Sequence, residues 1–145
     1  MLESSIPQKN SPDCRMLKSE FISKVIGIPW SNRACTFEAA DCWGLVVLYY
    51  RHVAGKEIHH YAGYESGNDF ITCFSEEVVF WRRSPTFTAE CLFIAYYGNQ
   101  QAHVGLILDG MALHSRGENG HVRADPVRII QKLYTKVEFY TYAAD

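Results

Sequence analysis

The chain has 145 residues, of which 48% are hydrophobic and 21% are charged, and its net charge is −2 at neutral pH. This length and composition predict one globular domain with a substantial core and exclude an intrinsically disordered protein. The small net charge gives no reason to expect nucleic acid or an anionic membrane as a partner.

The cysteines and the first residues bear on the compartment in which the chain works. The start lacks the basic and apolar regions of a signal peptide, and no apolar run reaches membrane-spanning length. The 5 cysteines are odd in number and scattered, which argues against a disulfide framework and against a four-cysteine zinc site. We therefore expect synthesis in a reducing cytoplasm, or export without a cleaved signal, and no metal or cofactor.

The N-terminal third is expected to contain an arm, a short helix and a loop. Residues 1–13 are polar and rich in turn formers, which indicates a flexible arm ahead of one domain that spans 14–145. An apolar stripe predicts a helix at about 14–25. In the loop that follows, Pro29 forbids a helix, and Trp30 either caps the core or forms a wall of a binding cleft.

The most informative stretch runs from residue 36 to residue 55. Asp41 is a good helix N-cap, Gly55 stands where a helix-ending glycine is wanted, and the residues between them are apolar almost all round. Cys42 therefore falls in the first turn of a buried helix, where backbone N–H groups and the helix dipole favour a thiolate. We predict Cys42 as a candidate nucleophile; a small buried hydrophobe is the alternative.

The rest of the chain changes from helices to strands. His59 and His60 lie in a turn-rich loop and point apart, which favours a solvated loop over a metal site. A second helix is predicted over 70–83 and ends at Ser84-Pro85. Strands are predicted at 91–97, 103–108, 111–115 and 137–142, with 121–123 and 127–130 as candidates for another. Helices followed by antiparallel strands indicate an α+β fold, with the N-terminal helices packed on an antiparallel sheet.

Two histidines are placed together by a predicted hairpin. Asp109-Gly110 between two apolar runs predicts a two-residue turn, which pairs Leu108 with Met111. His103 and His114 then become diagonal neighbours on one face, roughly 7–8 Å apart at the backbone. Small residues beside them, Gly105 and Ala112, leave room for a substrate or an approaching helix. A three-residue turn would separate the histidines.

This pair of histidines suits cysteine chemistry. One histidine takes the thiol proton and later protonates the leaving amine, while the other orients the first through its second ring nitrogen. The alternative is that each is a half-buried histidine with its hydrogen bonds satisfied. His52 and His121 are expected to be structural.

Across about 14–125 the chain carries, in this order, the motifs Gly27-Ile-Pro-Trp30, Asp41-Cys-Trp-Gly-Leu-Val46, His103-Val-Gly-Leu106 and His114. Together and in this order they resemble the NlpC-type family of cell-wall peptidases. The resemblance implies a papain-like fold and cleavage within the peptide stems of peptidoglycan. It further implies Cys42 as nucleophile, His103 as general base, His114 as the orienting residue and the Cys42 N–H as oxyanion donor.

Two positions depart from the family's pattern. Trp43 stands where the family usually has serine, and Trp30 stands where it usually has tyrosine. Both lie in the region that recognises the stem peptide in the family, where Asp41 can pair with a free amine. The resemblance therefore implies Trp30, Asp41 and Trp43 as substrate-binding residues.

The end of the Cys42 helix is similar to the family branch found in phage tail-assembly and tail-tip proteins. We therefore predict a cysteine endopeptidase that cuts the stem next to D-glutamate, made in the host cytoplasm and carried on a phage tail, where tail hub or tip proteins are its partners. A structural tail-tip protein with a silent site is the alternative. A deamidase or acyltransferase that uses the same residues also stays open.

Overall fold

The computed structural model describes residues 15–56, 81–86, 90–117 and 120–142. In chain order its elements are α1 (Lys18–Val25), β1 (Cys35–Thr36), β2 (Ala39–Ala40), α2 (Cys42–Tyr49), the π-helical segment η3 (Tyr50–Ala54), β3 (Trp81–Ser84), β4 (Glu90–Tyr97), β5 (Gln100–Leu108), β6 (Met111–Ser115), β7 (Val122–Pro126), α5 (Val127–Leu133) and β8 (Lys136–Tyr142). The expected arm at 1–13, the loop with His59 and His60, and residues 70–80 of the expected second helix lie outside the described residues.

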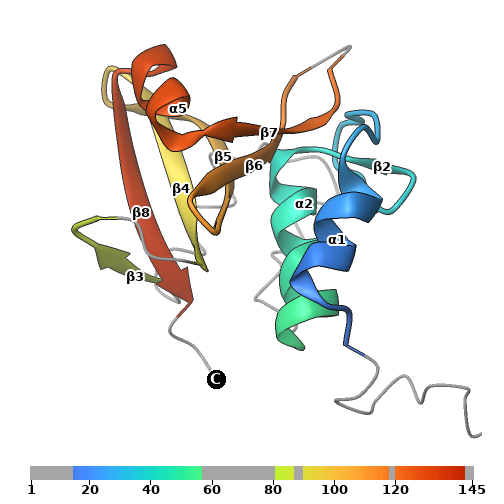
Figure 1. Ribbon diagram of the computed structural model, residues 1–145. Helices are drawn as coiled ribbons and strands as arrows, with labels where there is room; N and C mark the ends of the chain where they lie inside the picture. The colour runs from blue at the N-terminus through green and yellow to red at the C-terminus, as the bar shows by residue number, and fades with distance from the viewer. Residues whose placement is uncertain (1–14, 57–80, 87–89, 118–119, 143–145) are drawn as a thin grey trace, which may run out of the picture.

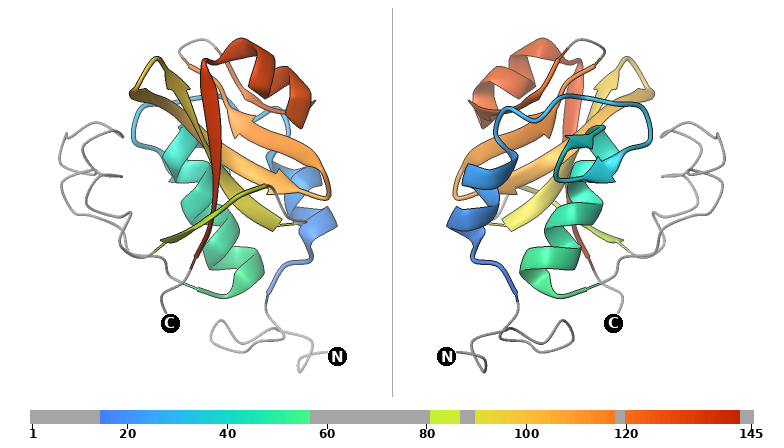
Figure 2. Two further views of the ribbon diagram at one scale, coloured as in Figure 1. Left: turned by 90° about the vertical axis from the view of Figure 1, so that its left-hand side faces the viewer. Right: turned by 90° about the vertical axis from the view of Figure 1, so that its right-hand side faces the viewer.

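A six-stranded antiparallel sheet forms the centre of the molecule, with strand order β3-β8-β4-β5-β6-β7. Helices α1 and α2 lie side by side against one face of this sheet, and α5 covers part of the other face (Figures 1 and 2). The predicted α+β class is therefore confirmed. No helix among the described residues is long and apolar enough to cross a membrane.

Each face of the sheet carries its own apolar cluster. The larger cluster joins the inward side chains of the strands to α1 and α2, through residues such as Phe21, Leu45, Leu48, Leu106 and Leu113. The smaller cluster joins the opposite side chains of the same strands to Val127 and Ile130 of α5. Because both faces are covered, β4 and β5 are nearly continuous apolar runs rather than alternating ones.

The helix predicted to run from Asp41 to Gly55 is present, but it changes type halfway. Its first part, α2, is apolar all round because it is buried by α1 on one side and by the sheet on the other. From Tyr50 the chain continues as the π-helical η3, and Gly55 ends it in the left-handed conformation with a φ of 72°. The N–H of Gly55 closes the wide turn on the carbonyl of Tyr50.

Gly44 has a steric role in the first turn of α2. A Cβ at this position would lie 1.9 Å from the carbonyl oxygen of Ala34. That same carbonyl accepts a hydrogen bond from the N–H of Asp41 at 3.1 Å, so the loop before the helix is held against its first turn. The glycine of the Asp-Cys-x-Gly motif is therefore required by the close approach of two backbone segments.

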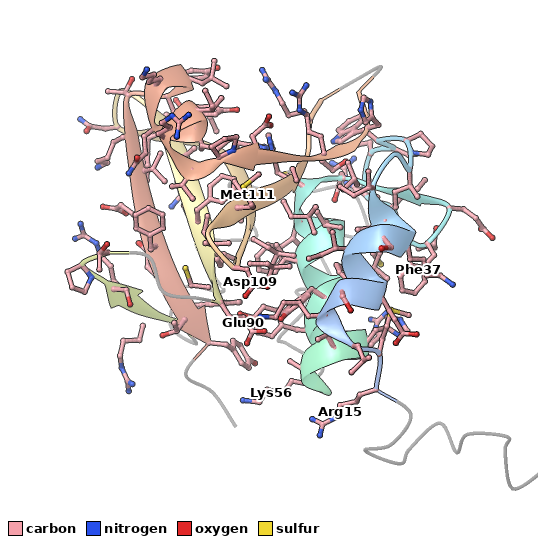
Figure 3. All side chains as sticks on the ribbon, in the orientation of Figure 1. Arg15, Phe37, Lys56, Glu90, Asp109 and Met111 are labelled. Carbon is pink, nitrogen blue, oxygen red and sulfur yellow. The ribbon has the colours of Figure 1, made fainter. Side chains whose placement is uncertain are left out.

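The hairpin between β5 and β6 has the predicted turn. Asp109 and Gly110 both have positive φ, at 53° and 85°, and Leu108 pairs with Met111. Asp109 lies at the tip of this hairpin (Figure 3). Its carboxylate lies 3.0 Å from the ammonium of Lys18 on α1. This pairing keeps the expected parity of the strands, on which the placement of the histidines depends.

Three of the predicted elements differ from those observed. Helix α1 begins at Lys18 rather than at residue 14, because the Glu20 carboxylate accepts the N–H of Leu17 at 3.0 Å and caps the helix there. Residues Trp81–Ser84 form an edge strand paired with β8, not the end of a helix, since Trp81 packs against Trp43 and Tyr142. The candidate strand at 127–130 is part of helix α5, while the candidate at 121–123 overlaps β7.

Candidate active site

The first turn of α2 is held in place through Asp41. Its Oδ1 accepts the N–H of Gly44 at 2.7 Å, and its Oδ2 accepts the N–H of Arg33 at 2.6 Å. The side chain therefore caps the helix, as the sequence predicts, and it also fixes the preceding loop. Only 4% of Asp41 is exposed, while Cys42, the next residue, is half-buried.

Two contacts join the start of helix α2 to the strands that carry the histidines. The hydroxyl of Ser115 on β6 donates a buried hydrogen bond of 2.6 Å to the carbonyl of Ala40, two residues before Cys42. On β5 the backbone N–H of Val104, next to His103, donates to the sulfur of Cys42. These contacts hold the first turn of α2 against β5 and β6, the two strands that carry His103 and His114.

The two histidines are in direct hydrogen-bond contact. Nε2 of His103 lies 2.9 Å from Nδ1 of His114, and both side chains are buried. The β5 register shifts between the pairs Ala95–His103 and Tyr96–Gln101, which places one extra residue directly before His103. A bulge of this kind re-aims the side chain that follows it.

Gly105 makes room for this pair in a different way from the one expected. A Cβ there would lie 2.5 Å from the ring of Phe93 and 2.8 Å from the Cβ of His114. The space beside Gly105 is therefore filled by Phe93, which contacts the rings of both histidines. The expectation that the space beside Gly105 admits a substrate or a helix is therefore wrong. For Ala112 the expectation of an approaching helix is right, because Ala112 packs in the same apolar cluster as Val127 and Ile130 of α5.

The thiol of Cys42 is not held as a thiolate. Burial, and then the neighbouring Asp41 carboxylate, raise the pKa of Cys42 to about 12. Backbone N–H groups of Val104, Trp43 and Cys42 act in the opposite direction, as expected at a helix N-terminus, but they do not outweigh burial. The predicted thiolate is therefore replaced by a neutral thiol in the resting state.

His103 also rests in its neutral form. Burial, followed by the nearby charges of His114 and Arg116, lowers the pKa of His103 to about 3. A neutral imidazole offers one nitrogen lone pair that can accept a proton. With Cys42 a neutral thiol and His103 a neutral imidazole, the resting site holds no thiolate–imidazolium ion pair between them.

Two further residues of the site were missed by the sequence reasoning. Asp125 on β7 places its Oδ2 2.8 Å from Nε2 of His114, which lengthens the chain of contacts by one residue. Tyr134, after α5, stacks on His103 with ring centroids 5.8 Å apart. For Asp125 the sequence offers only its spacing of 11 residues from His114, which equals the spacing of the two histidines but fixes no strand pairing.

The predicted substrate-binding residues differ in position. Trp30 is half-buried in the loop before α2, where its backbone N–H donates to the carbonyl of Gly120 at 3.0 Å. Trp43 is only 1% exposed and packs in the core against Trp81, so its indole supports α2 from within. Within residues 15–56, 81–86, 90–117 and 120–142, no group of three His, Cys, Asp or Glu side chains is arranged to hold a metal ion.

A cysteine at the N-terminus of a buried helix, packed on an antiparallel sheet that carries histidine, defines the papain-like class of folds. The NlpC/P60 family model matches residues 27–138. The chain belongs to the NlpC/P60 family.

Solved structures agree with this assignment at the level of the fold. The NlpC/p60 domain of the peptidoglycan hydrolase SagA is similar with a TM-score of 0.57 and 17% identity, over 85% of this chain and 93% of that one. An NlpC/P60 family protein from Bacillus cereus is similar with a TM-score of 0.51 and 18% identity, over 97% of this chain but 43% of that one. No curated protein matches the chain in a comparison of sequences.

Proposed function

We propose that the protein is a cysteine peptidase that hydrolyses an amide bond in the peptide stem of peptidoglycan, with Cys42, His103 and His114 as its catalytic residues. The observation that carries this proposal is the hydrogen bond of 2.9 Å between His103 and His114, on two strands that contact the helix whose first residue is Cys42. Family membership supports the substrate, and SagA, whose NlpC/p60 domain has a similar fold, is a peptidoglycan hydrolase.

The mechanism starts from the neutral thiol and the neutral imidazole. Because Nε2 of His103 is engaged by His114, Nδ1 is the nitrogen left to accept the proton of Cys42. The sulfur attacks the carbonyl carbon of the stem as its proton moves to His103. We assign the backbone N–H of Cys42 as the donor to the oxyanion that forms.

The second half of the reaction returns the proton. His103, now an imidazolium, protonates the leaving amine as the carbon–nitrogen bond breaks, which leaves a thioester on Cys42. Water then gives a proton to His103 and attacks the thioester, and the sulfur leaves with that proton to restore the thiol. Positioned acid–base catalysis of this kind contributes roughly 10²- to 10⁴-fold in rate.

Substrate recognition is proposed for the residues around the nucleophile. Trp30 offers a half-buried indole in the loop before α2. Asp41 offers a carboxylate to a free amine of the stem. Asp41 already accepts two backbone N–H groups, so an amine has to use the remaining lone pairs of its oxygens. We place the cut next to D-glutamate on the strength of the sequence resemblance.

The experiment is digestion of purified muropeptides by the intact protein, followed by mass spectrometry. Release of shortened stems by the wild type and none by Cys42→Ala, with an unchanged circular dichroism spectrum, is the expected result. Equal digestion by Cys42→Ala would remove Cys42 from its role. A product that keeps the mass of a transferred acyl group would assign the chemistry to acyl transfer instead of hydrolysis.

We further propose that the peptidase works as a component of a phage tail, made in the host cytoplasm and acting at the cell wall. The similarity of the α2–η3 sequence to tail-associated members of the family supports this role. Mass spectrometry of purified virions tests this role. Detection of the chain in the tails, with its loss when its gene is deleted, would support the role, and its absence from the tails would contradict it.

A second candidate is a tail protein with a silent or latent site. The raised pKa of Cys42 and the lowered pKa of His103 favour it, because they describe a resting site without an activated nucleophile. It predicts no turnover of any muropeptide by the wild type, together with assembly into tails that Cys42→Ala leaves undiminished.

A further inference from the structure

Asp125 extends the contact between the two histidines to a third strand. Its carboxylate is 2.8 Å from Nε2 of His114, and 9% of the residue is exposed. Strand β7 pairs with β6 so that Ala112 faces Asp125 and His114 faces Arg123. Asp125 is therefore the diagonal neighbour of His114, in the relation predicted for His103 on the opposite side. The three side chains form one line across β5, β6 and β7.

The state of the Asp125 carboxylate follows from its partners. Burial raises the pKa of Asp125, but hydrogen bonds from His114 and Arg123 outweigh burial and hold this pKa below its usual value. The carboxylate is thus ionised and only accepts hydrogen bonds. Nε2 of His114 must therefore carry a proton.

The proton positions on the histidines then follow in order. Burial lowers the pKa of His114 more than Asp125 raises it, so the ring is neutral. With its proton on Nε2, Nδ1 of His114 has a lone pair and accepts the N–H at Nε2 of His103. His103 is also neutral, so its Nδ1 carries the lone pair that the thiol proton of Cys42 requires.

We propose that Asp125 is a positioning residue of this site: it fixes the tautomer of His114, and through it the tautomer of His103, so that Nδ1 of His103 is always the base. The proposal rests on the proposed function of Cys42 and the two histidines. When His103 takes the thiol proton, the Asp125 carboxylate also balances the new positive charge across the neutral ring of His114.

Arg123 holds the carboxylate in the required plane. Its Nε lies 2.9 Å from Oδ2 of Asp125, and its Nη2 lies 3.0 Å from Oδ1. This two-point contact orients both oxygens, as guanidinium–carboxylate pairs do. The side chain of Arg123 is 50% exposed, so water can replace its hydrogen bonds when it is removed. Arg123→Gln is therefore a graded control that keeps the acceptor but loosens its orientation.

The experiment compares Asp125→Ala, Asp125→Asn and Arg123→Gln in the full chain. We expect Asp125→Ala to lower kcat on a stem peptide by roughly 10- to 100-fold with KM changed less than about 2-fold, the loss typical of an outer residue that orients a ligating or catalytic histidine. Asp125→Asn, whose amide oxygen accepts the same N–H without the charge, should lose less. Arg123→Gln should lose no more than a few-fold.

A second readout does not require turnover. Nitrogen-15 NMR of the histidine rings distinguishes a protonated Nδ1 from a protonated Nε2 in the free protein. The wild type should show both rings protonated at Nε2, and Asp125→Ala should show a mixture of tautomers at His114. An Nδ1-protonated His114 in the wild type, or wild-type kcat in Asp125→Ala, would overturn the proposal. If the wild type digests no muropeptide, the proposed function fails while the tautomers still decide the role of Asp125.

Discussion

The thiol of Cys42 stays protonated because its surroundings offer little to stabilise a negative charge. Burial, and after it the Asp41 carboxylate, raise its pKa to about 12, against the help of three backbone N–H groups. In the mechanism we propose, reactivity at neutral pH therefore comes from His103, which removes the proton as the sulfur attacks. We infer that the helix N-terminus alone does not make this cysteine a nucleophile.

The pH dependence of simple alkylation tests this account of Cys42. With iodoacetamide, the modification rate of Cys42 in His103→Ala, which lacks the base, should rise about 10-fold per pH unit from pH 6 to pH 9, without the plateau that a free thiol shows near ~8.5. The rate is followed by mass spectrometry of the peptide that contains Cys42.

Asp41→Asn supplies the matched control for this measurement. Asparagine caps a helix about as well as aspartate, but it removes the negative charge that raises the pKa of Cys42. The whole profile should therefore move to lower pH. A plateau below pH ~8.5 in His103→Ala, or a profile that adding Asp41→Asn leaves in place, would contradict this account.

At the scale of elements, the site depends on how closely β4, β5 and β6 approach one another. Phe93 on β4 lies against both histidine rings, and only the missing side chain of Gly105 allows this. Nε2 of His103 and Nδ1 of His114 stay 2.9 Å apart because the Phe93 ring packs against both histidines and fills the space beside Gly105.

Gly105→Ala should therefore damage the site more than the fold. The added methyl group would lie 2.5 Å from the Phe93 ring and 2.8 Å from the Cβ of His114, so one of the two must move. We expect a loss of roughly 10- to 100-fold in kcat and of about 1–3 kcal/mol in the free energy of unfolding. Steady-state kinetics and urea denaturation measure the two effects.

The double variant Gly105→Ala with Phe93→Leu is the rescue. Leucine lacks the ring atoms nearest to the new methyl group, so most of the activity should return. Full activity in Gly105→Ala alone, or no recovery in the double variant, would show that Phe93 does not control the position of His114.

The same strands show how much of this site the sequence can predict. Asp109-Gly110 fixes the turn by local chemistry, so the register of β5 and β6 and the meeting of His103 with His114 follow from it. Asp125 was missed because β7 follows a loop that fixes no register, so neither its partner strand nor its facing residue can be assigned from sequence.

Other differences arise from tertiary contacts that have no local signal. Trp81 joins an edge strand because Trp43 and Tyr142 pack around it, whereas its local pattern also suits a helix. The protonated thiol of Cys42 depends on how many atoms surround the sulfur, which the sequence does not state. Local patterns predicted the cap, the turn and the class of fold, while burial decided the chemistry.

At the scale of the whole molecule, the buried histidines couple folding to pH. The pKa of His103 is lowered to about 3 in the folded state, mainly by burial, against about 6.5 for an exposed histidine. Below pH ~6.5 the unfolded chain therefore binds a proton that the folded chain does not, and stability is lost as the pH falls. The lowered pKa of His114 acts in the same direction.

We accordingly expect the free energy of unfolding to fall between pH 6.5 and pH 4.5 by on the order of 1 kcal/mol per pH unit. Urea denaturation at several pH values measures this slope. His103→Gln, which cannot take up a proton, should show a shallower slope over the same range. A wild-type slope of the opposite sign, or an equal slope in His103→Gln, would contradict the neutral buried state of His103.

The measurement that tests the central claim most directly is labelling of the intact protein at pH 7 with a chloromethyl ketone that carries the L-alanyl-D-glutamate portion of the stem. Cys35 and Cys91 are present as thiols in the same structure and serve as internal controls. The account predicts that Cys42 alone is modified and that His103→Ala slows this modification at least about 100-fold, the lower range of positioned acid–base catalysis. Equal labelling of Cys35 and Cys42, or labelling of Cys42 that His103→Ala leaves unchanged, would contradict it.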